Sequence, residues 1–422
     1  MGDETPVVLR WEALSKRRFD ALPARCRTGP MPDLFNPTDE HRALRATLRE
    51  FAEREVKPQA AAADRDERFN LPLFRRLGQI GVLGVTVDDR FGGAGMDAIA
   101  AVIVHEELAA ADPGFTLAYL AHAILFANNL CRNGSDAQRE RWLPDACMGR
   151  TVGGMCMSEP AVGTDVLGMQ TTAVRNGDNW VLNGAKMWIT NGAVSDTELG
   201  DVFLVYANTG GRGSRGLSLF VVEKGTGGFR LGQKIKDKLG MRASTTAELL
   251  FEDCAVPAAN LIGGEGDAVG HMMRNLEMER LTLAAMSLGI ARRSVEVMNR
   301  YAAERKAFGQ PINQFGQVQR HIADAYAKFM AGRSYVYHVA AGFDLAASGT
   351  RVDSDGVKLF CSTMGKEVAD SAIQVLGGYG YVGEYEVERL WRDAKLLEIG
   401  GGTIEAHQKN IARDLAKATT IG

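Results

Sequence analysis

Glu279 is notable because it interrupts an apolar stripe of helical period. Five apolar side chains recur along one predicted helix face: Met272, Leu276, Leu283, Met286 and Ile290. Glu279 takes the position that would complete this stripe, between Leu276 and Leu283. A buried charge without a partner is unfavourable, so Glu279 either pairs with Arg274 or Arg280 or has its pKa raised until it can act as an acid or base. The stripe alone leaves both interpretations open.

A run of glycines is the second unusual feature. Residues 397 to 405 read LEIGGGTIE, and Gly400 to Gly402 interrupt sequence that favours helix on both sides. Consecutive glycines cost backbone entropy and provide no side chain to pack. They are typical of a tight turn or of the close approach of a ligand.

Two GxGxxG matches require a test against the dinucleotide-binding fingerprint, which needs a strand before the glycines and a helix after them. The match at 211–216 leads into LSLFVV, which favours a strand, and so predicts a hairpin loop. The match at 378–383 follows AIQVL, the end of a helical stretch. Neither match predicts nicotinamide binding through a parallel sheet.

Length and composition indicate a globular chain of two or three domains. The chain has 422 residues, 45% of them hydrophobic, and a net charge of -3. No window is expected to reach the roughly 18 uncharged apolar residues of a membrane helix. No basic block suggests a nucleic-acid partner. We therefore expect neither membrane insertion nor nucleic-acid binding.

Cysteines and histidines favour neither disulfides nor a metal site. The six cysteines are far apart and form no CxxC pair, which suits a reducing compartment. His105 precedes Glu106 and Glu107 but lacks the second histidine of HExxH, and the other six histidines are isolated. We expect no bound metal.

The elements that must position these residues follow a helix, sheet, helix order. Residues 1–35 are predicted to be an N-terminal extension. Helical patterns then begin at Thr38-Asp39, with Pro58 as a predicted stop, and continue over 97–111 and 115–131. Ser135 and Gln138 predict a capping box.

The sequence pattern changes from helical to strand-like near residue 153. Asn176-Gly177 and Asn183-Gly184 predict hairpin turns, and residues 201–207, 216–225 and 246–256 favour strands. After residue 266 helical periodicity returns, with a helix predicted from Gly270 to Arg305. We predict an α+β multidomain chain, with a helical domain over 36–152, a β domain over 153–265 and a helical domain over 266–422.

Six motifs in this order resemble the acyl-CoA dehydrogenase family: MCMSEPAVGTD (155–165), KMWITNG (186–192), KLGMRASTTAELLFEDCAVP (238–257), ERKAFGQPI (304–312), QVLGGYGY (374–381) and RDAK (392–395). The resemblance covers the chain from residue 36 onward. It implies a helical N-terminal domain, a central β-barrel-like domain and a C-terminal four-helix bundle. It also implies FAD as the cofactor, an acyl-CoA substrate, an electron-transferring flavoprotein as acceptor and a homotetramer.

The resemblance also assigns cofactor and substrate positions. Those implied for FAD are Met155, Met157, Ser158, Trp188, Thr190, Arg305, Phe308, Gln374, Gly377, Gly378, Thr403 and Glu405. Those implied for the thioester are Thr164, Glu277, Arg280 and Gly400. The chain departs from the family at Gly316, where related sequences commonly have a glutamine on the adenine side.

The same resemblance connects Glu279 to the glycines. Many members carry the catalytic base at the position of Gly401, immediately before the Gly402-Thr403 pair. A smaller branch, which acts on isovaleryl-CoA, carries the base on a helix in a segment like LEMER (276–280), at Glu279. Glu279 is therefore the expected base, and the Gly401 N–H is expected to polarise the thioester carbonyl.

The reaction implied is FAD-dependent conversion of isovaleryl-CoA to 3-methylcrotonyl-CoA, a step of leucine catabolism. Three alternatives stay open from the sequence: a flavin oxidase or monooxygenase on the same fold, action on a carrier-protein thioester, and a flavin-free scaffold. The expected compartment is the mitochondrial matrix in a eukaryote and the cytoplasm in a bacterium.

Overall fold

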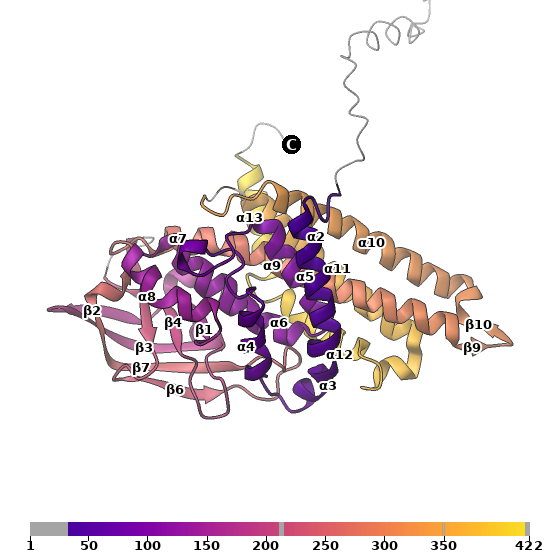
Figure 1. The fold of residues 1–422 in the computed structure, drawn as a ribbon, viewed down its shortest axis with the longest axis horizontal. Coiled ribbons are helices and arrows are strands. Elements are labelled where there is room, and N and C mark those ends of the chain that lie inside the picture. The colour runs from indigo at the N-terminus through magenta and orange to yellow at the C-terminus, as the bar shows by residue number, and fades with distance from the viewer. Residues whose placement is uncertain (1–32, 211–214, 348, 350, 418–422) are drawn as a thin grey trace, which may run out of the picture. The chain divides into compact units, whose positions relative to one another are not determined.

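The computed structural model describes residues 33–210, 215–347, 349 and 351–417. The predicted extension therefore lies almost wholly outside the described residues, as do residues 211–214 of the first GxGxxG match. The described residues from 34 onward form one unit, drawn in Figure 1. Its element order is helices, then strands, then helices, and the predicted fold class is confirmed.

The N-terminal helices are α2 (Asp39–Phe51), α3 (Lys57–Arg65), α4 (Leu71–Gln79), α5 (Ala98–Ala109), α6 (Pro113–Leu120), α7 (Asn129–Asn133) and α8 (Asp136–Cys147). Thr38 caps α2 by accepting a hydrogen bond from the His41 N–H. Ser135 and Gln138 form the predicted capping box of α8. Both predicted helix starts are confirmed.

The prediction that Pro58 stops the first helix is wrong. A π-helical segment, Ala52–Val56, joins α2 to α3, and Pro58 lies in the first turn of α3. The Lys57 N–H bonds to the Ala52 carbonyl, five residues back. Proline has no N–H and cannot donate a helical hydrogen bond. Because a π-helical turn precedes Pro58 and Pro58 itself lies in the first turn of α3, the helix continues without losing a further backbone hydrogen bond.

The expectation that no segment has the length and apolarity of a membrane helix is also wrong. Pro113–Asn133, which comprises α6, a π-helical segment (Ala121–Asn128) and α7, has an 18-residue window of mean hydropathy 1.2. That window is 100% buried inside the fold. A core helix meets the same criteria of length and composition, because it is apolar on all sides.

The central domain is built on one mixed sheet with the order β6-β7-β3-β2-β4-β5-β8, and β1 pairs with β4. Its strands are β1 (Gly153–Cys156), β2 (Thr172–Asn176), β3 (Asn179–Thr190), β4 (Val202–Asn208), β5 (Leu217–Glu223), β6 (Phe229–Lys234), β7 (Thr246–Pro257) and β8 (Leu261–Ile262). The strands predicted over 201–207, 216–225 and 246–256 are confirmed. β1 and β6 were not delimited by the sequence patterns.

Of the two predicted hairpin turns, only Asn176-Gly177 is confirmed, between the antiparallel strands β2 and β3. Asn183 and Gly184 lie within β3, where the register against β7 shifts. A Cβ on Gly184 would approach the Thr171 Oγ1 to 2.6 Å, and the φ of Gly184 is 149°. Glycine therefore permits a bulge here rather than a turn.

The C-terminal helices are α9 (Ala268–Glu304), α10 (Gly316–Ala341), α11 (Arg351–Leu376), α12 (Val387–Leu397) and α13 (Ile404–Leu415). A short hairpin of β9 (Lys306–Ala307) and β10 (Gln310–Pro311) follows α9. Figure 1 shows α9, α10 and α11 side by side, and each of these helices contacts the other two.

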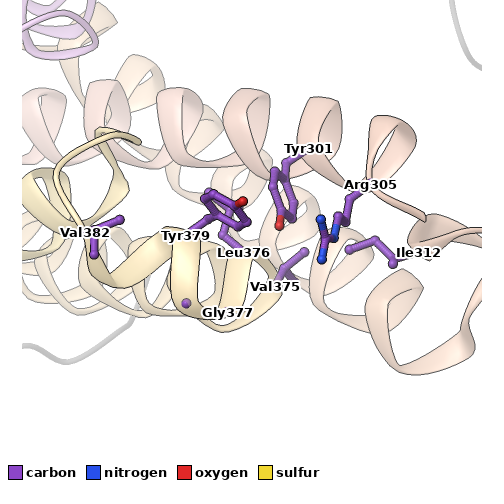
Figure 2. A pocket seen from close by; sticks show the side chains of 9 residues that line it. Tyr301, Arg305, Ile312, Val375, Leu376, Gly377, Tyr379 and Val382 are labelled. Atoms are coloured by element: carbon purple, nitrogen blue, oxygen red, sulfur yellow. The ribbon is translucent and has the colours of Figure 1, made fainter. Parts of the chain in front are cut away.

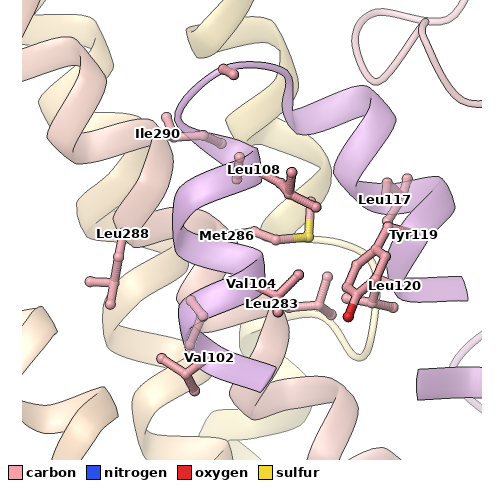
Figure 3. Packing of buried hydrophobic residues seen from close by; sticks show 14 of the residues in the cluster. Val102, Val104, Leu108, Leu117, Tyr119, Leu120, Leu283, Met286, Leu288 and Ile290 are labelled. Atoms are coloured by element: carbon pink, nitrogen blue, oxygen red, sulfur yellow. The ribbon is translucent and has the colours of Figure 1, made fainter. Parts of the chain in front are cut away.

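One apolar core joins the N-terminal helices to α9. Figure 3 shows Leu108 of α5, Tyr119 of α6 and Leu283 and Met286 of α9 in this core. Leu283 is one helical turn after Glu279, so the packing that fixes α9 also fixes the carboxylate.

Candidate active site

Glu279 is buried in α9 with no ion-pair partner among the described residues. The residue is 8% exposed, and its Oε2 has no hydrogen-bond partner in the part of the chain that the structure describes. Burial raises the pKa of Glu279 from 4.5 to about 7, although the positive charges of Arg280 and Lys358 oppose this shift. A carboxylate with a pKa near neutrality can both accept and hold a proton under ordinary conditions.

The two arginines that the sequence offered as partners have other contacts. Arg280 pairs with Asp355 of α11, with 3.1 Å between Nη1 and Oδ1. Arg274 donates to the Asn128 side chain and to the Leu345 carbonyl. Neither guanidinium forms an ion pair with Glu279, so the ion-pair interpretation has no support in the geometry.

The glycine run forms a left-handed turn between α12 and α13, directly beside Glu279. Gly401 has a φ of 67° and Gly402 a φ of 107°. A Cβ on Gly401 would lie 3.5 Å from the Cδ and Oε1 of Glu279, and 2.4 Å from the Leu283 Cδ1. The Gly401 N–H has no hydrogen-bond partner among the described residues. The turn therefore brings an unpaired donor next to an unpaired carboxylate, while Gly400 has room for a side chain.

Three of the residues implied for FAD meet in a cleft at the end of the bundle. Arg305, Gly377 and Gly378 are among the residues that line this cleft, and the cleft has a volume of about 490 Å³. The Arg305 guanidinium lies 5.8 Å from the ring centre of Tyr379 (Figure 2). A Cβ on either glycine would meet nothing within 4 Å, so the backbone there is open. Gln374, on α11 next to Val375 of the cleft, is not among the lining residues.

Phe308 lies apart from that cleft, between β9 and β10. It is 96% exposed, has a φ of 50° and packs edge-on against Phe315, with ring centres 6.1 Å apart. Gly316, the departure from the family pattern, is the first residue of α10. A bulky residue with positive φ and almost no cover is a strained position.

Five further predicted cofactor residues lie in the sheet domain. Met155 belongs to β1, Met157 and Ser158 follow it, and Thr190 ends β3. The Met187 N–H donates to the Ser158 carbonyl, which ties this segment to β3. Trp188 is 61% exposed with a φ of 66°, at a register shift of β3. The sheet thus presents a large aromatic face in a strained backbone.

The sequence reasoning missed the buried ion pair that supports this segment. Lys186 donates to the Glu159 Oε1 at 2.8 Å and to the Met157 carbonyl at 3.2 Å. Both side chains of the pair are buried. The lysine in KMWITNG was a readable signal, because a charged residue within a strand of this kind must have a partner.

The four remaining predicted site residues are distributed over three segments. Thr164 is exposed in the loop after β1. Glu277 is buried in α9 and accepts a hydrogen bond from the Gly349 N–H. Thr403 caps α13 by accepting from the Ala406 N–H, and Glu405 is exposed in the first turn of that helix. Of the predicted residues, the structure therefore brings together Glu279, Arg280 and the glycine turn, and separately Arg305, Gly377 and Gly378.

Comparison with known proteins assigns the chain to a family. Family models match over 38–150 ("Acyl-CoA dehydrogenase, N-terminal domain"), 154–254 (middle domain) and 250–416 (C-terminal domain). The chain belongs to the acyl-CoA dehydrogenase family, whose members are FAD-dependent oxidoreductases.

The relatives differ in the substrate that they name. The chain is 42% identical to the mitochondrial isovaleryl-CoA dehydrogenase of Pongo abelii, over 91% of this chain and 90% of that protein. Butyryl-CoA dehydrogenase of Megasphaera elsdenii is 33% identical, with a TM-score of 0.85 over 90% of this chain and 99% of that one. A glutaryl-CoA dehydrogenase of Mycobacterium smegmatis, solved with FADH2, is 29% identical with a TM-score of 0.84 over 91% and 96%.

The residues present fit FAD. The cleft at Arg305 offers a guanidinium beside backbone without side chains, which suits an anionic pyrophosphate. Trp188 offers an exposed aromatic face, which suits a flat ring system. Activity as an acyl-CoA dehydrogenase follows from the family.

Proposed function

We propose that this enzyme oxidises a short branched acyl-CoA, isovaleryl-CoA, to its α,β-unsaturated product, with Glu279 as the base. The observation that carries the proposal is the unpaired Glu279 carboxylate facing Gly401, where a Cβ would lie 3.5 Å away. Family membership supports the reaction class. The similarity to an isovaleryl-CoA dehydrogenase supports the substrate.

Glu279 removes the α proton of the thioester. Burial raises the pKa of Glu279 to about 7. A general base works best when its pKa is close to the pH of the reaction, so this value suits neutral conditions. Entry of the acyl chain would exclude water and raise this pKa further. The proton stays on the carboxyl group after transfer, where burial already favours the neutral form.

The Gly401 N–H stabilises the charge that develops on the carbonyl oxygen as that proton leaves. It is available because no group among the described residues accepts from it. A fixed donor in a water-poor site is worth more than one in solvent, since it needs no reorganisation during the reaction.

Arg305, Gly377 and Gly378 would hold the pyrophosphate of the FAD of a neighbouring subunit. Trp188 with Thr190 and Ser158 would hold the ring system of the FAD bound to this chain. Bound FAD supplies the acceptor for the hydride that leaves the β carbon. The further positions Met155, Met157, Phe308, Gln374, Thr403 and Glu405 are proposed for FAD, and Thr164, Glu277, Arg280 and Gly400 for the thioester.

The glycines support a short branched substrate. A side chain at Gly401 would occupy the space between Glu279 and Leu283, and Gly400 leaves further space open. Branching at the β carbon needs width at this point. One methylene more or less in such a pocket changes discrimination by about 1–3 kcal/mol.

A panel of thioesters tests the substrate. We expect the highest kcat/KM with isovaleryl-CoA and lower values for straight chains longer than about eight carbons, because discrimination follows pocket size. A maximum at long linear chains, or with a carrier-protein thioester, would contradict the proposal.

We also propose that electrons pass to an electron-transferring flavoprotein and that the enzyme is a homotetramer. The exposure of Phe308, at 96%, supports a partner surface at the β9–β10 hairpin. Gel filtration with light scattering tests the oligomer. An oxidase would instead form hydrogen peroxide in air without a flavoprotein, and that result would replace the dehydrogenase assignment.

A further inference from the structure

Behind the glycine turn lies a cluster of buried charged side chains that sequence reasoning did not single out. Asp355 and Lys358 of α11 and His407 of α13 are each 0% exposed. Asp355 and Lys358 are three residues apart and so share one face of α11. Both face the region of Glu279 and Arg280, since Arg280 pairs with Asp355 and the Lys358 charge acts on Glu279.

His407 joins this cluster to the glycine turn. Its Nδ1 lies 2.6 Å from the Asp355 Oδ1, and its Nε2 lies 3.0 Å from the Gly402 carbonyl oxygen. A carbonyl oxygen only accepts hydrogen bonds, and the Asp355 Oδ1 also forms an ion pair with Arg280. Each ring nitrogen of His407 therefore faces an acceptor, the Asp355 carboxylate on one side and the Gly402 carbonyl on the other.

The imidazole also explains the third glycine. A Cβ on Gly402 would lie 2.9 Å from the His407 Cε1 and 3.1 Å from its Nε2. Gly402 therefore lacks a side chain because the ring is packed against the backbone there. Gly401 lacks one because Leu283 and Glu279 occupy the other side of the turn.

The other end of the turn is held by α11, the helix that carries Asp355. Lys358 donates from Nζ to the carbonyl of Leu397, the last residue of α12. One face of α11 thus fixes the chain on both sides of Gly401. Lys358 holds the end of α12 directly, and Asp355 holds Gly402 through His407. Asp355 also pairs with Arg280, the residue next to Glu279. The base and the turn are therefore both held by α11.

We propose that His407 is a positioning residue that, held by Asp355, sets the place of the Gly401 N–H relative to Glu279. The inference rests on the proposed function, since it takes Glu279 as the base. His407 does not touch the reacting atoms. It acts through the Gly402 carbonyl, and its loss allows the turn to move away from the carboxylate.

The test compares His407→Gln with His407→Arg in the FAD-loaded enzyme. Glutamine donates from one nitrogen only and so cannot satisfy both acceptors, whereas arginine has several donors. We expect His407→Gln to lower kcat about 100-fold, the scale of a 1 Å misplacement, with a smaller change in KM. His407→Arg should recover at least about a tenth of wild-type kcat. His338→Gln, an exposed histidine in the same bundle, is the matched control.

Hydrogen–deuterium exchange of segment 398–404 gives a readout that needs no substrate. We expect faster exchange in His407→Gln and near wild-type exchange in His407→Arg and His338→Gln. If exchange and kcat do not change together in His407→Gln, the proposal is wrong.

Should His407→Gln fail to fold, His407→Arg still decides, because loss of either protection or activity in that folded variant overturns the proposal. Failure of the proposed function has a different signature. It would leave Glu279→Gln fully active while the exchange result for His407 still holds.

Discussion

Two buried carboxylate sites in this molecule have opposite surroundings. Glu106 and Glu107 of α5 are 0% and 1% exposed and contact four arginines, among them Arg45 and Arg292. Burial opposes ionisation of Glu107, but the arginines, led by Arg292, outweigh it and lower its pKa to about 2. Glu279 of α9 has no such partner, and its pKa rises to about 7.

The difference teaches that burial alone does not define a candidate catalytic acid or base. The Glu107 site joins α2, α5 and α9 through paired charges, which is a structural use of a carboxylate. Among the described residues, the Glu279 carboxylate is unpaired and lies beside a turn whose Gly401 N–H is also unpaired, an arrangement that costs stability and is typical of functional sites. The two sites should therefore respond to the same substitution in opposite ways.

Glu279→Gln should give the largest effect on activity. We expect turnover to fall by about 10²–10⁴-fold, because the amide is nearly isosteric but cannot accept the α proton. FAD content and thioester binding should be retained, as measured by absorbance and by titration with a substrate analogue. Near-normal turnover would remove Glu279 from the role of base.

Glu107→Gln should give the largest effect on stability. Removing one partner leaves buried arginines without compensation, so we expect the free energy of unfolding to fall by about 3–5 kcal/mol. Denaturant unfolding measures this change at fixed protein concentration. Activity per folded, flavin-loaded molecule should stay close to wild type, and a selective loss of kcat would mean that the two sites are coupled.

The pH dependence of stability should have opposite signs at the two sites. The folded pKa of Glu279, about 7, lies above its unfolded value of 4.5, so this group stabilises the fold at low pH and loses that contribution as pH rises to 7. The shift corresponds to roughly 3 kcal/mol.

The folded pKa of Glu107, about 2, lies below 4.5, so its contribution to stability is present above pH 4.5 and is lost as pH falls toward 2.

Because the pKa of Glu279 is raised on folding, Glu279→Gln should raise the melting temperature above pH 7, relative to wild type, and have little effect near pH 4.5. A lower melting temperature for this variant at pH 8 would instead indicate a structural partner for Glu279.

Gly401→Ala and Gly400→Ala form a pair with a smaller expected difference. At Gly401 the positive φ costs about 1–2 kcal/mol for a residue with a Cβ, and the methyl group would approach Leu283 to 2.4 Å. At Gly400 the nearest atom would be 3.5 Å away, an ordinary contact. We expect the larger loss of kcat/KM in the first variant and a smaller loss in the second, where the methyl group only narrows the space proposed for the acyl chain. Equal losses would show that the turn tolerates no change of any kind.

Much of the fold was readable because local patterns decided it. Thr38 and Ser135 mark helix starts that depend only on their immediate neighbours. Asn183-Gly184 was misread because a hairpin turn and a bulge use the same residues, and only the pairing of β3 with β7 distinguishes them. Pro58 was misread because a π-helical turn of the preceding residues accommodates it.

By itself, the sequence determined the α+β class, the family resemblance and the anomaly of Glu279, because periodicity and ordered motifs are properties of the linear chain. Only the tertiary structure decided what Glu279 contacts, since Arg280 turns to Asp355, more than seventy residues away along the chain. It also decided why the glycines stand together, because Leu283 and His407 approach the turn from different helices. Contacts between distant segments depend on packing, which no local pattern encodes.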